Sequence, residues 1–517
     1  MKRALILAWL VVVIWAWWPV LSVGFLADDY EWLPVVSQLS GRQVWQLFWP
    51  ETAVVRYRPL VGLSFWFDYR LWGFRPLGYH LSNLFFHLLG VLAVFVLGRL
   101  VWSWGRKKEE ALGLCVGLVA AVLFAVNPLF PETVTWISGR HDLLAATLLL
   151  WCLVFFIRFL QSDFRRLELF GIAFTFGTLA LFAKETAVVI PLLVCTIYIY
   201  YVLLINRKMR SRRFQIILEK SGWVLPFLLA IGLYIWVSSL ALGRPVWAVR
   251  GLPFVVSRPF LLWVLLSCIF SLGAWGKRPF IKGKTWLPWL GVGMSLLPVS
   301  MFPTQLRFLY LPSAFGAIWL AFLVFGAGKR LGKMAVGLVF VVCSLFSVGW
   351  LYSRNLAWVE ASRLHQQVSE QTGNLILQEK ARLVYVFNLP DHVGEVQLFR
   401  SHVKEAVFLE RGWLGKTFPH YPIDIVVGPM TVDLGKTEAA VVDVLRVKLR
   451  SDSGFVVFEP AIARRNDDGS LEIDWAGEWQ ATISADRKEA VVKLPHQLDE
   501  EGVLGVVFED GEVRRLL

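Results

Sequence analysis

The chain has 517 residues, of which 56% are hydrophobic, 18% are charged and 26 are tryptophan, and its formal net charge is +13. Soluble chains are ~45–50% apolar, so this composition, with a mean hydropathy of +0.57, excludes an ordinary soluble protein and indicates a polytopic membrane protein. Lys and Arg fall mainly in short breaks between apolar runs, and no basic helix or finger motif occurs, so the charge predicts membrane topology and not nucleic-acid binding.

About eleven apolar runs are long enough to cross a bilayer, which takes ~20 residues per helix. The first has an apolar core too long for a signal peptide and no small-x-small cleavage pattern, so it is predicted to be a retained span. The predicted spans are 4–23, 81–101, 112–127, 143–160, 168–183, 187–205, 222–241, 260–276, 286–301, 309–328 and 335–352.

The basic breaks between spans predict the orientation. Five of them should lie, with Lys2 and Arg3, on the cytoplasmic side. They are residues 106–108, 165–166, 206–213, 276–284 and 328–333. An odd number of spans then places the N-terminus inside and the C-terminus outside, together with the loop 24–80. Two amphipathic stretches of that loop, DDYEWLPVVSQL and RPLVGLSFWFDYRLW, predict helices along the interface.

The character of the chain changes after Arg354. LVYVFNLP, VVDVLRVKLR, GFVVFEP and AVVKLP alternate or cluster β-branched and aromatic residues between turn signals such as Asn466-Asp467-Asp468-Gly469. These patterns predict a membrane domain over residues 1–355, mainly α, and a β-rich extracytoplasmic domain over residues 365–517. The second domain contains no acid–base cluster near the bilayer and is expected to do no chemistry.

Residues 23–34, VGFLADDYEWLP, place three carboxylates directly after the first apolar run. Asp28 and Glu31 fit a D-x-x-E capping box, in which a carboxylate accepts backbone N–H groups at a helix start. A cap does not account for two consecutive aspartates, and a capping carboxylate can also act as a base. Asp28 and Asp29 are therefore candidate catalytic residues. Carboxylates also ligate Mg²⁺ or Mn²⁺, but two adjacent ones are no metal signature, which leaves a metal requirement open.

Other ionisable groups gather at the ends of later spans, where charge is costly unless it faces a cavity or a partner. The loop and helix start at 127–146 contain Glu132, Arg140, His141 and Asp142. Solvated pairs, for instance Arg140 with Asp142, are the structural alternative to substrate binding there. Lys184 and Glu185 interrupt the apolar run LALFAKETAVVIPLL and predict a helix break, whose two charges either neutralise each other or bind a ligand.

Two further features lie on the second and tenth spans. His80, Asn83 and His87 follow spacings of three and four, so they share one helix face, and hydrogen bonding between helices is the plainer explanation. Arg307, in TQLRFLYLPS, is a candidate phosphate ligand because a guanidinium offers a bidentate fork. An arginine that snorkels to lipid head groups is the alternative.

Several of these stretches resemble a known family. The run RPLVGLSFWFDYRLWGFRPLGYHLSNLFFHLLGVLAVFVL is similar to the first-loop and second-helix signature of GT-C glycosyltransferases. Within them it is closest to the transmembrane and tetratricopeptide-repeat O-mannosyltransferases and their bacterial relatives. LFAVNPLFPETVTWISGRHDLLAATL, LFAKETAVVIPLL and RFLYLPSAFGAIWL resemble three further blocks, in the family's order. The resemblance covers roughly residues 20–360, and the combination of blocks carries it.

This resemblance implies a GT-C fold, a polyprenyl-phosphate sugar donor and an acidic catalytic residue in the first outer loop, carried here by Asp28 or Asp29. The candidate substrate-binding residues are Arg58, His80, Glu132, Arg140, His141, Asp142, Lys184, Glu185 and Arg307. The chain departs from the family in two ways. Asn127-Pro128 stands where the family often has His-Pro, and the β-rich tail replaces the tetratricopeptide repeats, so the acceptor cannot be carried over.

Physical reasoning reaches the same class. Nucleotide sugars are cytoplasmic, whereas the charged residues are predicted on the outer face, so the sugar must arrive on a membrane lipid. Arg140, Lys184 or Arg307 would stabilise the charge of the departing phosphate, and an aspartate would deprotonate the acceptor hydroxyl. We therefore predict a glycosyltransferase of the bacterial cytoplasmic (inner) membrane, acting on a protein, glycan or lipid acceptor. The alternative is a non-catalytic transporter or assembly scaffold with a degenerate GT-C fold, although a transporter should place its charges near the midplane.

Overall fold

The computed structural model describes residues 11–49, 57–104, 109–205, 221–242, 286–298, 305–399, 402–412, 423–443, 445–456, 462–475, 479–509 and 511–516. The chain divides into two compact units: Met1–Leu21 with Leu39–Asn355, and Ser22–Gln38 with Leu356–Leu517. Residues 22–38 of the first loop, predicted in the membrane domain, belong to the unit that contains the strands, and that unit resumes at Leu356, before the predicted start at 365. The span predicted at 260–276 lies outside the described residues.

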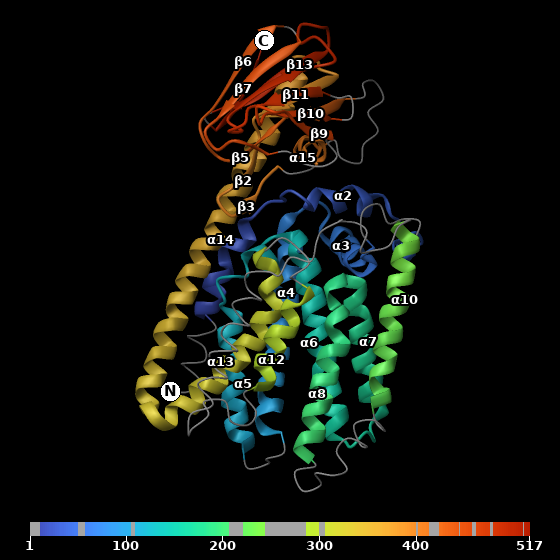
Figure 1. The fold of residues 1–517 in the computed structure, drawn as a ribbon, viewed down its shortest axis with the longest axis vertical. Helices are drawn as coiled ribbons and strands as arrows, with labels where there is room; N and C mark the ends of the chain where they lie inside the picture. The colour runs from blue at the N-terminus through green and yellow to red at the C-terminus, as the bar shows by residue number, and fades with distance from the viewer. Residues whose placement is uncertain are drawn as a thin grey trace. The chain divides into compact units, whose positions relative to one another are not determined.

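The first unit is built from helices that stand side by side (Figure 1). Its helical elements are η2 (Val44–Phe48), α3 (Pro59–Trp72), α4 (Pro76–Ser103), α5 (Glu110–Ala125), η5 (Pro131–Thr135), η6 (Ile137–Gly139), α6 (Arg140–Gln161), α7 (Leu167–Ala183), η7 (Glu185–Val189), α8 (Ile190–Ile205), η8 (Ser221–Val224), α10 (Leu225–Leu242), α12 (Trp286–Leu296), η12 (Leu306–Leu309) and α13 (Tyr310–Leu331). In addition, η1 (Trp18–Ser22) ends at the boundary between the units, and α14 (Lys333–Gln378) crosses it.

Six helices within the described residues are long and apolar enough to cross a membrane. They are Pro76–Ser103, Ile137–Gln161, Glu185–Val202, Gly222–Leu242, Leu306–Gly326 and Met334–Gln378, and the shorter apolar helices are Val11–Ser22, Glu110–Ala125 and Leu167–Ala183. The predicted helical, membrane-spanning character is confirmed, but the number of about eleven spans is not established by these helices.

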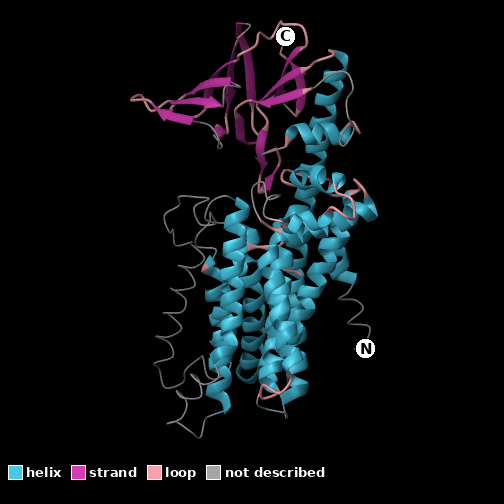
Figure 2. Ribbon diagram, turned by 90° about the vertical axis from the view of Figure 1, so that its right-hand side faces the viewer, coloured by secondary structure: helices cyan, strands magenta, loops and turns pink. Residues whose placement is uncertain are grey.

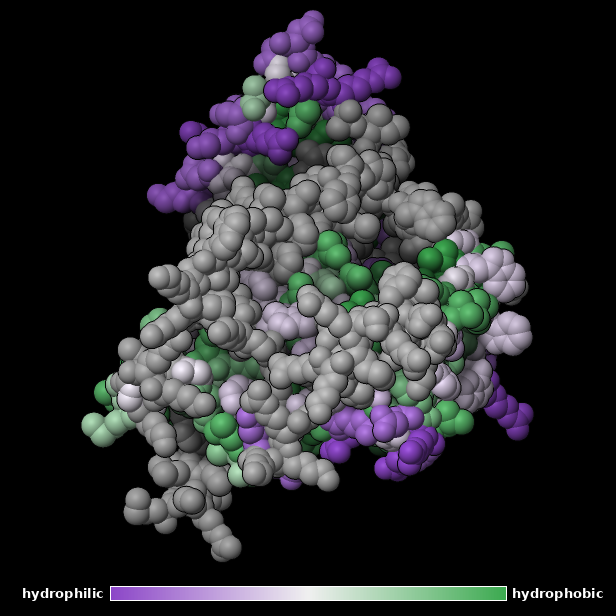
Figure 3. Space-filling model, turned by 60° about the horizontal axis from the view of Figure 1, so that its bottom comes forward, coloured by the Kyte–Doolittle hydropathy of each residue, from purple (hydrophilic) through white to green (hydrophobic). Residues whose placement is uncertain are grey.

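The outside of the helical unit is apolar, as a lipid-facing surface requires. On α4, Leu81, Phe85, Leu88 and Leu92 recur on one face and are 41%, 57%, 59% and 46% exposed. Figure 3 shows hydrophobic residues, in green, exposed at several places on one face of the molecule. A water-soluble protein rarely exposes apolar stripes of this kind, so the chain is a multi-pass membrane protein.

Close helix contacts inside the unit depend on small residues. A Cβ placed on Gly117 of α5 would lie 2.5 Å from the carbonyl oxygen of Phe95 on α4, and one on Gly98 would lie 3.2 Å from the Cα of Gly117. Glycine at these positions lets the two backbones approach, which is how membrane helices gain packing without a hydrophobic driving force.

Helix α14 runs well beyond the predicted span 335–352. Its first half exposes apolar side chains such as Phe346 and Trp350, as expected in lipid. After Asn355, buried positions recur every three or four residues, including Trp358, His365 and Thr372. The side chains between them are largely polar, so the helix continues as an amphipathic element that packs within the second unit. Residues 365–378 are consequently helical, and the strands begin only at Leu383.

The second unit combines α2 (Asp29–Gln38), the end of α14, α15 (Val403–Glu410) and three sheets (Figure 2). The strands are β1 (Leu383–Phe387), β2 (Pro390–Val393), β3 (Val396–Gln397), β4 (Asp424–Val427), β5 (Met430–Asp433), β6 (Thr437–Asp443), β7 (Arg446–Ser451), β8 (Phe455–Val456), β9 (Ile462–Arg465), β10 (Leu471–Trp475), β11 (Trp479–Ile483), β12 (Glu489–Lys493), β13 (Val503–Glu509) and β14 (Glu512–Arg515).

Each sheet has its own topology. The orders are β14-β13-β1-β4, β6-β7-β12-β11-β10-β9 and β3-β2-β5-β8. Strand β1 is parallel to both β13 and β4, whereas all pairings in the six-stranded sheet are antiparallel. In β7, Val447 and Leu449 are buried and Lys448 between them is exposed, so the predicted alternation with period two is confirmed. The predicted turn at 466–469 closes the β9–β10 hairpin, where Gly469 has φ +84° and the Asn466 N–H donates to the Ser470 carbonyl at 2.9 Å.

Candidate active site

A helix break in the first unit points the side chains of Lys184 and Glu185 in different directions. Helix α7 ends at Ala183, Lys184 is extended with φ −160° and ψ 141°, and η7 begins at Glu185. The predicted break is thus present. Adjacent residues in extended backbone point to opposite sides, and Lys184 and Glu185 bind different partners, so they do not form a self-contained pair.

Both charges of the break have close partners. The Lys184 ammonium donates to both carboxylate oxygens of Asp142 at 2.6 Å, and the Arg58 guanidinium donates to the two oxygens of Glu185 at 2.6 and 3.1 Å. Lys184 lies between two helices, where burial lowers the pKa of its ammonium to about 8 against the opposing effect of Asp142. The two pairs join α3, α6 and the break.

Arg140 is fully buried and does not pair with Asp142. Its guanidinium forms an ion pair with Asp68 at 2.5 Å, and its Nε and Nη2 donate to the Asn83 side chain at 2.7 Å and to the Tyr79 carbonyl at 2.9 Å. The alternative of an Arg140–Asp142 pair is therefore wrong, because residues two apart on a helix face different sides. Arg140 ties α6 to α3 and α4.

The polar stripe of α4 lies in the interior of the unit. The Asn83 amide donates to the carbonyls of Val134 and Trp136, both at 3.1 Å, and so holds the segment before α6. His87 lies 2.8 Å from the Tyr310 hydroxyl, measured from its Nδ1. His80 is buried as well, while His141, second residue of α6, is half-buried. Hydrogen bonding between helices is confirmed for Asn83 and His87.

Glu132 and Arg307 form a further charged pair beside Asp142. A Glu132 carboxylate oxygen accepts from the Arg307 backbone N–H at 3.2 Å, and the Arg307 guanidinium lies 3.6 Å from Glu132 and 3.7 Å from Asp142. The guanidinium also lies over the Trp136 ring, 4.9 Å from its centroid. Burial raises the pKa of the Glu132 carboxyl, and Arg307 opposes this shift.

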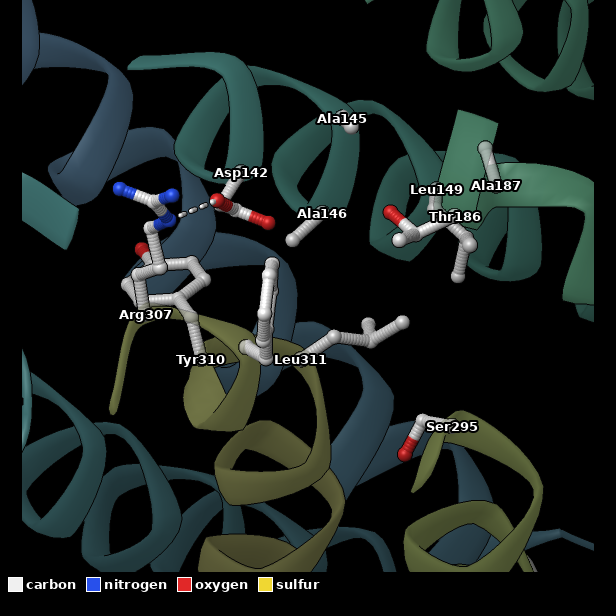
Figure 4. Close-up of a pocket in the computed structure, with 11 residues that line it drawn as sticks. Asp142, Ala145, Ala146, Leu149, Thr186, Ala187, Ser295, Arg307, Tyr310 and Leu311 are labelled. Atoms are coloured by element: carbon white, nitrogen blue, oxygen red, sulfur yellow. Dashed lines mark ion pairs between the residues drawn. The ribbon is translucent and has the colours of Figure 1, made fainter. Parts of the chain in front are cut away.

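Of these charged groups, Asp142 and Arg307 line a cavity with a polar end and an apolar wall (Figure 4). Arg307 and Asp142 face each other at one end, and Ala146, Leu149 and Leu311 follow along the wall. The cavity is also lined by Ala145, Thr186, Ala187, Ser295, Phe308 and Tyr310. The structure thus brings together Glu132, Asp142, Lys184 and Arg307, with Arg58 and Glu185 adjoining through the break.

The two candidate catalytic residues, Asp28 and Asp29, belong to the second unit. Asp29 is the first residue of α2 and 2% exposed, and its carboxylate accepts from the Leu26 N–H at 2.9 Å, while Asp28 is half-buried. Ala27 has φ +45°, a left-handed conformation that is uncommon for a residue with a Cβ and often marks functional turns. Among the described residues, no group of three or more His, Cys, Asp or Glu side chains is arranged to hold a metal ion.

Sequence reasoning missed two residues that shape this site. Asp68 is the counter-charge of Arg140, and its signal was a lone carboxylate inside the apolar run GLSFWFDYRLW. Gly139 has no Cβ where the chain needs close approach, since a Cβ there would lie 2.4 Å from the Glu132 carbonyl oxygen and 2.7 Å from that of Thr133. Neither neighbouring oxygen can move without moving the backbone of η5.

Replacing Gly139 with Ala is therefore expected to displace the segment that holds Glu132 and Arg307. Overpacking of this kind costs about 1–3 kcal/mol, so we expect a lower thermal unfolding temperature of the purified protein. Gly171→Ala is the matched control, because in the described ranges no atom beyond the local helix backbone lies within 4 Å of a Cβ at Gly171. Equal unfolding temperatures for the two variants would show that η5 accommodates the added methyl group without loss of stability.

Fold and site together define a multi-pass membrane protein with an ion-pair cluster at the polar end of an interhelical cavity. No family model matches the chain. Protein O-mannosyl-transferase Tmtc2 of Drosophila melanogaster is 30% identical over 193 residues, covering 34% of this chain and 20% of that protein. Human protein O-mannosyl-transferase TMTC4 is 39% identical over 97 residues, covering 17% of this chain and 13% of that protein. The matches thus span about a fifth or less of these relatives.

Solved structures provide a further comparison. The crystal structure of ArnT from Cupriavidus metallidurans in the apo state is 12% identical, covers 82% of this chain and 86% of that chain, and has a TM-score of 0.47. The predicted resemblance to the transmembrane O-mannosyltransferases is confirmed by the similarity to Tmtc2 and TMTC4.

Proposed function

We propose that this protein is a membrane glycosyltransferase that moves a sugar from a polyprenyl-phosphate donor to a hydroxyl acceptor on the outer face of the cell membrane. The relatives matched in part of the chain are named protein O-mannosyl-transferases, which supports transfer of a sugar. The cavity supports a donor with a lipid phosphate. The main observation behind the proposal is the incomplete pairing of Arg307.

Arg307, whose side chain is 12% exposed, differs from the buried cations of the first unit. Arg58, Arg140 and Lys184 each have a carboxylate at 2.6 Å or less. Both ion pairs of Arg307 are longer than 3.5 Å, and its Nε has no hydrogen-bond partner among the described residues. A buried donor left unpaired is costly unless a ligand completes it. Arg307 is thus the cation best placed to bind an incoming anion.

The chemistry of the cavity fits a lipid phosphate. A phosphate offers the oxygen atoms that a guanidinium binds in a bidentate manner, and the wall of Ala146, Leu149 and Leu311 suits a hydrocarbon chain. Lys184 adds a second positive charge beside Asp142. When the sugar leaves, negative charge grows on the phosphate, and fixed cations in a site shielded from water stabilise it.

The acceptor hydroxyl needs a general base, and we assign this role to Asp28 or Asp29 on the strength of the family resemblance. The same resemblance supports an outer-face reaction, because a sugar carried by a membrane lipid does not depend on cytoplasmic nucleotide sugars. A non-catalytic scaffold is the alternative, and a sugar-transfer assay with a polyprenyl-phosphate sugar decides between them.

Binding of a polyprenyl phosphate without sugar tests the site directly. In lipid nanodiscs, titration followed by tryptophan fluorescence should report binding, since Trp136 lies against Arg307. We expect Arg307→Gln to weaken binding about 10- to 100-fold, because hydrogen bonds to charged groups contribute ~1.5–3 kcal/mol, and Arg307→Lys to fall between this variant and the parent.

Two controls make this result specific. Arg166→Gln removes an exposed arginine whose partner, Glu168, is also exposed, and it should bind like the parent. Polyprenol, which lacks the phosphate, should bind equally to the parent and to Arg307→Gln. If Arg307→Gln binds the polyprenyl phosphate as tightly as the parent, the phosphate site lies elsewhere.

A further inference from the structure

The loop that carries Asp28 and Asp29 packs on the C-terminal part of the chain within the second unit. A Cβ on Gly24 would lie 3.6 Å from the Cβ of Ser362 on α14. The Tyr30 ring stacks on His365 of the same helix, with 5.3 Å between ring centroids and 16° between ring planes. His365 stacks in turn on Phe399, at 4.5 Å and 17°. Three rings from three separate segments form one stack.

This stack begins one residue after the aspartate pair. Short backbone bonds close the turn: the Asp29 N–H donates to the Leu26 carbonyl at 2.9 Å, and the Tyr30 N–H donates to the Ala27 carbonyl at 3.2 Å. Ala27 between them has φ +45°. A left-handed alanine costs free energy and persists only where surrounding contacts hold it. Tyr30 is 1% exposed, so its buried ring anchors the turn.

His365 contributes to the stack as a flat ring. It is 1% exposed, and its Nδ1 has no hydrogen-bond partner within the part of the chain that the structure describes. The contacts of His365 that the structure shows are those of its ring, with Tyr30 on one hand and Phe399 on the other. Stacked aromatic rings contribute through area and ring geometry, which phenylalanine can also supply.

The strands hold the helix on which this stack rests. The Val513 N–H of β14 donates to the Gln371 side chain at 2.9 Å, and Arg515 forms an ion pair with Glu379 at 2.7 Å. Gly373 lets the Arg411 side chain lie against α14, where a Cβ would meet its Cγ at 2.6 Å. The end of α14 is thus fixed to the β-rich region through Gln371 and Glu379 and contacts Tyr30 through His365.

We propose that the part of the second unit that follows Asn355 positions the Asp28–Asp29 turn, with His365 as a positioning residue that acts through Tyr30. The effect of this positioning on catalysis rests on the proposed function, in which Asp28 or Asp29 is the general base. The sequence predicts that the β-rich region does no chemistry. On this proposal, catalysis nevertheless depends on that region, because it holds the turn. Removing it would release the turn that carries the proposed base.

Hydrogen–deuterium exchange of the full chain in nanodiscs tests the support independently of any activity. We expect His365→Ala to speed exchange of the amides of Leu26, Asp29 and Tyr30 about tenfold, since loss of aromatic pairs shifts a local opening equilibrium by about this factor. His365→Phe should keep exchange within about twofold of the parent. His496→Ala is the matched control, because His496 is exposed and its ion pair is with Glu500.

Sugar transfer by the same variants gives the second readout. His365→Ala should lower kcat about tenfold and leave binding of polyprenyl phosphate unchanged, while His365→Phe should restore kcat. Unchanged exchange in His365→Ala would overturn the proposal. A loss of kcat in His365→Phe equal to that in His365→Ala would overturn it too, because the imidazole would then act chemically.

Two further provisions keep the outcome decisive. If His365→Ala does not fold, Phe399→Leu removes a ring of the stack at similar volume and should speed exchange in the same three amides. If the parent transfers no sugar from any polyprenyl-phosphate donor, the proposed function fails. The exchange data still decide whether the part of the second unit after Asn355 holds the turn.

Discussion

Replacing Asp28 with Asn is expected to lower sugar transfer at least about a hundredfold, because loss of a general base typically costs 10²–10⁴-fold in rate. An amide has nearly the shape of a carboxylate and still accepts hydrogen bonds, so thermal unfolding should stay nearly unchanged. Initial rates with a polyprenyl-phosphate sugar, together with a melting curve of the same preparation, measure both.

The structure separates the two aspartates. The Asp29 carboxylate accepts the Leu26 N–H and is almost fully buried, whereas Asp28 is half-buried. We therefore expect Asp29→Ala to lower stability by about 1.5–3 kcal/mol, the range for a hydrogen bond to a charged group, because it removes the acceptor of the Leu26 N–H. Asp28→Asn should carry the larger loss of rate. If neither Asp28→Asn nor Asp29→Asn slows transfer, the base lies elsewhere, and Glu132 is the next candidate.

Replacing Asp68 with Asn is expected to destabilise the helical unit by about 3–5 kcal/mol, because it leaves the guanidinium of Arg140 buried without a counter-charge. The ion pair lies in the interior, where Arg140 is 0% and Asp68 6% exposed by side chain. The fraction of protein that stays folded after heating, followed by size-exclusion chromatography, measures the loss.

A second substitution should restore much of this stability. With Arg140→Met added to Asp68→Asn, no unpaired charge is left, and replacing a buried pair as a whole is often nearly neutral. Glu168→Gln, which breaks an exposed pair with Arg166, should change little. If Asp68→Asn alone is as stable as the parent, Arg140 draws its stabilisation from Asn83 and Tyr79.

Local sequence patterns were sufficient to predict many helices and strands of this chain. Apolar runs placed the helices from α4 to α8, because a membrane helix must cover ~20 residues with side chains that tolerate lipid. The charges at Lys184 and Glu185 marked a helix break, since neither is tolerated inside an apolar span without a partner. Alternation with period two marked β7 and β12, whose buried and exposed residues face opposite sides of the sheet.

Which residues pair with each other is decided only by the tertiary structure. Arg140 pairs with Asp68 and not with Asp142, and Arg58 reaches Glu185 across 127 positions of sequence. Tyr30 of the first loop stacks on His365, and residues 22–38 of this loop belong to the second unit. Periodicity tells which face of an element is buried, but which faces meet depends on contacts between segments far apart in the chain. The low dielectric of the interior then makes each such pairing decisive, and no local sequence window contains that information.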